Sequence, residues 1–155
     1  MQNMFAKLFI GATITAIGAF GADNSIGNWK LNLEKSTYNP GPPTVKSLTA
    51  ARQASEEGVN SVSTGELANG DAINSSYTAK YDGKDYPVTG APWDTVSIKQ
   101  VDANTFTSES KKTGGTYNST SRTEISKDGN TMTVSSKGTN AAGKAFDNIL
   151  VYDKQ

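Results

Sequence analysis

The chain has 155 residues, in which 15 Lys and Arg balance 15 Asp and Glu, and it contains neither Cys nor His. The charges alternate in sign without a basic block, which argues against binding to nucleic acid or to anionic membrane surfaces. The missing Cys excludes disulfides, and the missing His removes the side chain most used in acid–base catalysis and transition-metal binding.

The N-terminal segment has the features of an export signal. Lys7 is followed by an apolar stretch, residues 8–20, without an ionisable side chain, as in a signal peptide. This stretch is shorter than the roughly 20 residues of a transmembrane helix, so a retained membrane anchor is the less favoured alternative. Small residues at Ala19 and Gly21 suit a peptidase site,. We therefore predict that residues 1–21 are a signal peptide, ending at Gly21 or one residue later, and that the protein is secreted or periplasmic.

The remainder, residues 22–155, is long enough for a single domain with its own core. Its short segments rich in Val, Ile, Thr, Tyr and Phe alternate with Gly, Asn, Asp and Pro, which is typical of strands joined by turns,. Ten strands are predicted, at Asn28–Leu33, Val45–Gln53, Val59–Glu66, Ile73–Tyr81, Lys84–Val88, Thr95–Val101, Thr105–Ser110, Thr116–Ile125, Thr131–Lys137 and Ala145–Tyr152.

The turns between these strands carry a regular signal. The pairs are Asn69-Gly70, Asp82-Gly83, Gly114-Gly115, Asp128-Gly129 and Ala142-Gly143. Such pairs tolerate the positive φ of tight turns, so each predicts a β-hairpin. Consecutive hairpins favour an all-β, antiparallel up-and-down β-barrel of about 8–10 strands, because closure removes exposed edges. A two-sheet sandwich is the alternative.

The expected barrel wall is unusually polar. Several predicted strands carry Ser, Thr or Asn on both faces, as in residues 59–64 and 116–123. A small barrel with so few large aliphatic residues is either filled by a handful of aromatic side chains or encloses a polar, partly hydrated cavity. The sequence leaves this choice open.

The opening of the first strand, Gly27-Asn28-Trp29-Lys30-Leu31, resembles the G-x-W-K pattern of the calycin superfamily, the lipocalins and fatty-acid-binding proteins. This resemblance implies a ligand-binding barrel in which Trp29 plugs the closed end beneath a basic side chain. Arg122 is assigned to that role, ahead of the four lysines that follow it. Residues 29–32 and 81–87 also resemble a small secreted bacterial family of unestablished activity.

Two features depart from the fatty-acid-binding pattern. Residues 32–44 are Pro-rich where those proteins have a helical lid. Their Arg-x-Tyr pair, which holds a carboxylate, is replaced here by Leu150-Val151-Tyr152. Tyr152 matches and the arginine does not, which argues against a fatty acid as the ligand.

We therefore predict a monomeric lipocalin-like barrel that binds a small, moderately apolar molecule in its interior. We expect no catalysis, no cofactor, no metal, no nucleic acid and no membrane contact after signal cleavage. The expected ligand-binding residues are Tyr77, Tyr81, Phe106, Tyr117, Arg122 and Tyr152.

Two alternatives remain. The first is an interaction scaffold whose exposed loop at residues 87–94, with Trp93 at its centre, contacts another macromolecule,. The second is a glycoside hydrolase, which needs two acids facing each other across a cleft. Most acidic residues here fall in turns beside Gly, where Asp favours local hydrogen bonds,.

Overall fold

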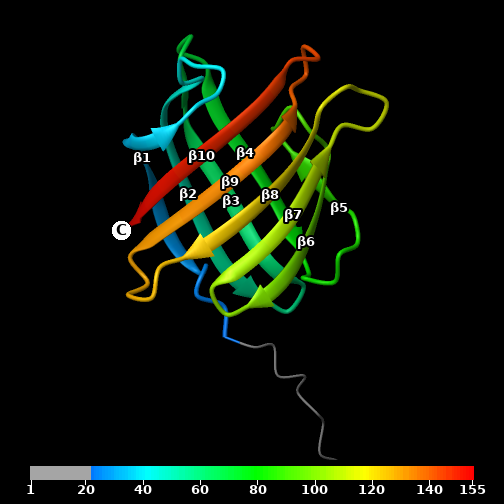
Figure 1. Cartoon of the computed structure of the whole chain (residues 1–155). Coiled ribbons are helices and arrows are strands. Elements are labelled where there is room, and N and C mark those ends of the chain that lie inside the picture. The colour runs from blue at the N-terminus through cyan, green and yellow to red at the C-terminus, as the bar shows by residue number, and fades with distance from the viewer. Residues whose placement is uncertain (1–21) are drawn as a thin grey trace, which may run out of the picture.

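A computed structural model describes residues 22–155, so the predicted signal peptide lies outside the described residues. The described residues form a closed barrel of ten antiparallel strands (Figure 1). These are β1 (Gly27–Thr37), β2 (Val45–Ser55), β3 (Gly58–Leu67), β4 (Ala72–Ala79), β5 (Tyr86–Thr89), β6 (Thr95–Asp102), β7 (Thr105–Lys111), β8 (Asn118–Ile125), β9 (Thr131–Thr139) and β10 (Ala145–Lys154). The predicted all-β barrel is confirmed.

Each strand pairs with its neighbour in sequence, and β1 pairs with β10 to close the barrel. Strand pairing is least extensive at β5, which is short and has only two paired positions with each neighbour. Within residues 22–155, no helix is long and apolar enough to cross a membrane.

The turn signals are borne out with one exception. Gly70 and Gly129 have φ values of 95° and 73° in the connections between their strands. Asp82-Gly83, predicted to form a tight hairpin, lies instead in the longer loop between β4 and β5. The Gly83 amide donates to the Ile98 carbonyl at 3.0 Å, and Asp82 forms a bridge with Lys99. This loop is therefore held by β6 rather than folded back on its own strand.

The two ends of the barrel differ. At one end, which we call the closed end, the chain enters β1 and residues 22–26 lie across the opening. Asn24 donates its backbone amide to Ala103 and the Gln100 side chain donates to the Ala22 carbonyl. A buried cluster fills the barrel there, made of Trp29, Leu31, Ile125, Met132 and Tyr152. At the opposite end, which we call the open end, the longer loops gather, including the Pro-rich loop after β1 (Figure 1).

Candidate functional site

The inner wall changes character along the barrel axis. Near the closed end, side chains that point inward are buried, as Leu31 and Met132 are. Toward the open end, some inward-facing side chains, such as Val134 and Leu150, remain partly exposed, whereas Val88, Val96 and Ser119 are buried there as well,. The barrel is therefore filled at the closed end and only partly accessible to solvent toward the open end, mainly along β9, β10, β1 and β2.

A polar row crosses the accessible part of the wall. Ser108 of β7 lies opposite Ser121 of β8, which lies opposite Ser136 of β9, and Asn148 of β10 continues the row. We call the three serines the serine row. None of their hydroxyls has a hydrogen-bond partner among the described residues, and none is sealed from solvent. Strand alternation turns these side chains toward the accessible interior, where water or a ligand can reach them, and the same three serines also border the groove on the outer face of β6–β10,.

Aliphatic side chains line part of the accessible interior. Leu33, Leu48, Val134 and Leu150 are partly buried and pack on the cluster at the closed end. The accessible interior thus has an apolar wall from β9, β10, β1 and β2, and a hydroxyl-bearing wall from β7 to β9. Such a combination suits a small molecule that is mainly apolar and carries some polar atoms.

Trp29 is fully buried at the closed end, where its indole nitrogen donates to the Ser25 carbonyl at 2.8 Å. The basic side chain over its ring is Lys154, whose Nζ lies 5.1 Å from the ring centroid. The assignment of Arg122 to this role is wrong. The reason is register: β1 and β10 are neighbours, and Trp29 lies directly opposite Lys154.

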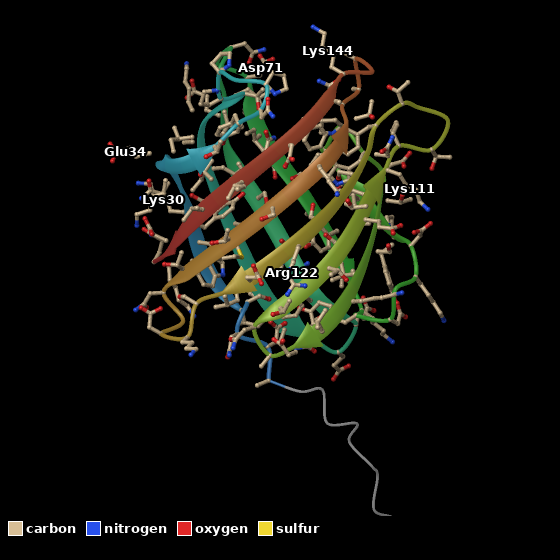
Figure 2. All side chains as sticks on the ribbon, viewed as in Figure 1. Lys30, Glu34, Asp71, Lys111, Arg122 and Lys144 are labelled. Carbon is tan, nitrogen blue, oxygen red and sulfur yellow. The ribbon has the colours of Figure 1, made fainter. Side chains whose placement is uncertain are left out.

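Arg122 is also wrong as an interior ligand residue. Its side chain is exposed on the outer face of β8 and donates through Nε to Glu124 at 3.1 Å (Figure 2). Strand alternation gives the reason, because the neighbours Ser121 and Thr123 take the inward positions,.

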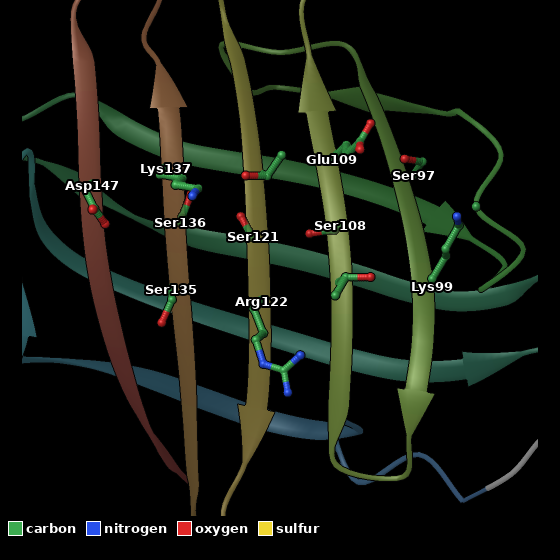
Figure 3. Close-up of a pocket in the computed structure, with 13 residues that line it drawn as sticks. Ser97, Lys99, Ser108, Glu109, Ser121, Arg122, Ser135, Ser136, Lys137 and Asp147 are labelled. Carbon is green, nitrogen blue, oxygen red and sulfur yellow. The ribbon is translucent and has the colours of Figure 1, made fainter.

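Arg122 instead lines a groove of about 560 Å³ on the outer face of β6–β10 (Figure 3). Charged side chains of both signs line this groove, namely Lys99, Glu109, Arg122, Lys137 and Asp147. Because cations and carboxylates nearly balance, the groove selects no ligand charge. A second groove of about 580 Å³ lies over β3–β5 and reaches Tyr77, next to the weakly paired strand β5.

Tyr77 and Tyr81 lie in a polar network that the sequence analysis missed. Arg52 of β2 points into the barrel and donates through Nη1 to the Tyr77 hydroxyl at 3.0 Å and through Nε to Ser25 Oγ at 3.1 Å. Tyr81 donates to the Asp23 carboxylate. Arg52 could have been found from period-two alternation, because it shares its strand face with Leu48 and Ala50, which pack inward,.

The electrostatics of this network keep Arg52 charged. Burial acts to lower its pKa, but the hydrogen bond to Tyr77 and the electrostatic influence of Tyr77, Tyr81 and Asp23 outweigh burial and raise the pKa overall,. Burial, together with the hydrogen bond to Asp23, raises the pKa of Tyr81 to about 12. The network therefore places a fixed positive charge inside the barrel.

The other predicted ligand residues are not gathered around one cavity. Phe106, 3% exposed, packs against Tyr81 with the ring centroids 5.1 Å apart. Tyr152, 6% exposed, belongs to the cluster at the closed end, and burial raises its pKa. Tyr117 stacks on Trp93 with the ring centroids 4.9 Å apart.

Trp93 itself is partly buried and packs against the second core cluster, which includes Val88 and Val96. An interaction scaffold required this side chain to be exposed. The packing of Trp93 on Tyr117 and the core therefore counts against that alternative.

One further tyrosine lies in the accessible part of the barrel. The Tyr38 hydroxyl, just after β1, is buried and has no hydrogen-bond partner among the described residues. Burial raises its pKa, so the hydroxyl keeps its proton at neutral pH,. It is the one buried side-chain polar atom in residues 22–155 that lacks a partner.

Comparison with known proteins identifies the fold. No model of a known protein family matches the sequence, and no curated protein matches it. Among solved structures, the S-type phycobiliprotein lyase CPES from Guillardia theta is similar to this chain, with a TM-score of 0.56 and 11% sequence identity. The match covers 85% of this chain and 89% of the lyase chain. The chain thus shares its fold, a closed antiparallel β-barrel, with this lyase.

This match also corrects one expectation. Composition and fold led us to expect that the chain is not an enzyme, and that inference is wrong. A similar fold is found in a phycobiliprotein lyase. The fold and the missing His therefore give no ground for excluding catalysis.

Proposed function

We propose that this protein binds a small, moderately apolar molecule inside the barrel, admitted through the open end. One observation carries this proposal: the inner wall toward the open end is partly exposed, and its serine row has hydroxyls without protein partners. A ligand there would contact the aliphatic wall and accept or donate hydrogen bonds at Ser108, Ser121 and Ser136.

The interior is a better candidate than either outer groove. Apolar side chains form much of its wall, and transferring apolar ligand surface out of water favours binding by about 25 cal/mol per Å². The groove over β6–β10 is lined by charged residues and hydroxyls instead. A mainly apolar molecule would gain little there.

Titration with the uncharged fluorophore N-phenyl-1-naphthylamine tests this proposal. The dye brightens in apolar surroundings, so the wild-type protein should give a saturable rise in emission. Ser136 and Ser135 are adjacent on β9 and face opposite sides of the wall. We expect Ser136→Leu to weaken dye binding about tenfold by filling the interior, and Ser135→Leu to leave it unchanged.

Two results would contradict the proposal. One is the absence of saturable binding to the wild-type protein. The other is an equal effect of the two Leu variants, which would place the dye on the outer surface. Circular dichroism of both variants serves as the control for folding.

We also propose that the protein acts outside the cytoplasm. The apolar stretch at residues 8–20 supports export,. Ala22, which follows the predicted cleavage site, accepts a hydrogen bond from the Gln100 side chain of the barrel. Mass spectrometry of the protein from its own host should give the mass of residues 22–155 or 23–155. The mass of the uncleaved chain would contradict export by cleavage.

A further inference from the structure

The chain has two arginines, Arg52 and Arg122, and they stand in opposite environments. Arg122 is exposed on the outer face and pairs with the Glu124 carboxylate. Arg52 points inward and contacts only two neutral hydroxyl oxygens, those of Ser25 and Tyr77. No ion pair to Arg52 forms among residues 22–155.

The carboxylate of this network, Asp23, already accepts hydrogen bonds from other groups. It accepts hydrogen bonds from the Ser25 backbone amide at 2.9 Å, from Ser25 Oγ at 2.6 Å and from Tyr81. Asp23 lowers the potential at Arg52 from a distance but offers it no direct contact. A charge that is partly withdrawn from water and has no direct counter-ion is costly, so an anion at Arg52 would be stabilised,.

The hydrogen-bond inventory points the same way. A guanidinium has five N–H donors, and two of those of Arg52 are used, one on Nε and one on Nη1,. Nη2 has no partner among the described residues, and it is not sealed from solvent. The Tyr77 hydroxyl accepts from Arg52, and its own proton has no acceptor among these residues. Several unused donors of Arg52 and Tyr77 therefore meet at one place inside the barrel, beside the Ser61 hydroxyl.

We propose that Arg52 and Tyr77 form an oxyanion site, and that the molecule bound in the barrel carries a carboxylate, sulfonate or phosphate group. This inference rests on the proposed function, since it names the polar group of the interior ligand. The guanidinium fork would hold two anion oxygens, and the Tyr77 hydroxyl would donate a further hydrogen bond. The apolar part of the ligand would extend from this site along the aliphatic wall toward the open end.

Two dyes that differ by a single group test the inference. 1-Anilinonaphthalene-8-sulfonate has the ring system of N-phenyl-1-naphthylamine and adds one sulfonate. We expect the wild-type protein to bind the sulfonated dye about tenfold more tightly than the uncharged dye, the gain typical of a charge-assisted hydrogen bond.

Arg52→Gln should abolish this preference and leave the affinity for the uncharged dye within about twofold of wild type. Arg122→Gln is the matched control, because it removes the other arginine from the outer face, and it should leave both affinities unchanged. Tyr77→Phe, which keeps the ring, should weaken only the sulfonated dye, about threefold, and it provides a second test if Arg52→Gln does not fold.

The outcomes separate the two proposals. If the uncharged dye fails to bind the wild-type protein, the interior site itself is contradicted. If that dye binds and the sulfonate adds no affinity, the oxyanion site is overturned while the interior site stands. Equal losses of sulfonated-dye affinity in Arg52→Gln and Arg122→Gln would also overturn the oxyanion site, because surface charge would then account for the preference.

Discussion

The ammonium group of Lys154 lies 5.1 Å from the centroid of the Trp29 ring. These residues are 125 positions apart, and they meet because the first and last strands pair to close the barrel. Lys154 makes a cation–π interaction with Trp29 and also shields the Trp29 ring from solvent at the closed end,. It therefore links closure of the barrel to packing of its largest fully buried side chain.

Replacing the cation over Trp29 should lower stability slightly. We expect Lys154→Met to reduce the free energy of unfolding by about 0.5–1 kcal/mol, the value of a partly exposed cation–π contact. Arg122→Met, which removes only an exposed ion pair with Glu124, should change it by less than about 0.5 kcal/mol. Urea denaturation followed by circular dichroism measures both. A larger loss in Arg122→Met would contradict this account of the closed end.

The two tryptophans should differ in their contribution to stability. Trp29 is 0% exposed and bonded to Ser25, so Trp29→Ala should cost about 3–5 kcal/mol. Trp93 is only partly buried and stacks on Tyr117, so Trp93→Ala should cost less, about 1–2 kcal/mol. Denaturant titration of the two variants provides the comparison, and equal losses would argue against the assignment of Trp29 as the plug.

Alkaline pH should weaken the network at the closed end through Tyr81. Its pKa is raised from 10.0 to about 12 in the folded protein, so the protonated phenol is favoured by folding. The resulting stabilisation is complete below pH 10 and is lost as the pH rises through about 12. Tyr81→Phe should therefore lose less stability than wild type between these pH values. Unfolding free energies at pH 8 and pH 11.5 test this, and parallel losses in the two proteins would contradict it.

At neutral pH, replacing Tyr38 and replacing Tyr81 should change the stability of the protein in opposite directions. Because this hydroxyl is buried without a partner, Tyr38→Phe should stabilise the unliganded protein by about 1 kcal/mol. Tyr81→Phe removes a hydrogen bond to Asp23 and should destabilise it by about 1 kcal/mol. Thermal denaturation at pH 7 distinguishes the two. A destabilised Tyr38→Phe variant would show that this hydroxyl is already hydrogen-bonded in solution.

The sequence alone determined the local structure. Alternation of apolar and polar residues set the strands, and pairs such as Asp128-Gly129 set their turns, because both depend on residues close together in the chain. The longer β1, which runs to Thr37, and the bridge from Asp82 to Lys99 were missed. Both depend on contacts with distant strands, since β10 pairs with the end of β1 and β6 holds the loop.

Only the tertiary structure decided which charged side chains enter the barrel. Alternation puts Arg52 on the same strand face as the apolar Leu48 and Ala50, which favours the inside. Arg122 has Ser and Thr on both faces of its strand, so its sequence context does not state which face is inward,. Closure through β1 and β10, with its particular register, turned Arg52 toward Tyr77 and Arg122 toward solvent. Register sets the face of every side chain in a strand, and register is settled by pairing between segments far apart in the chain.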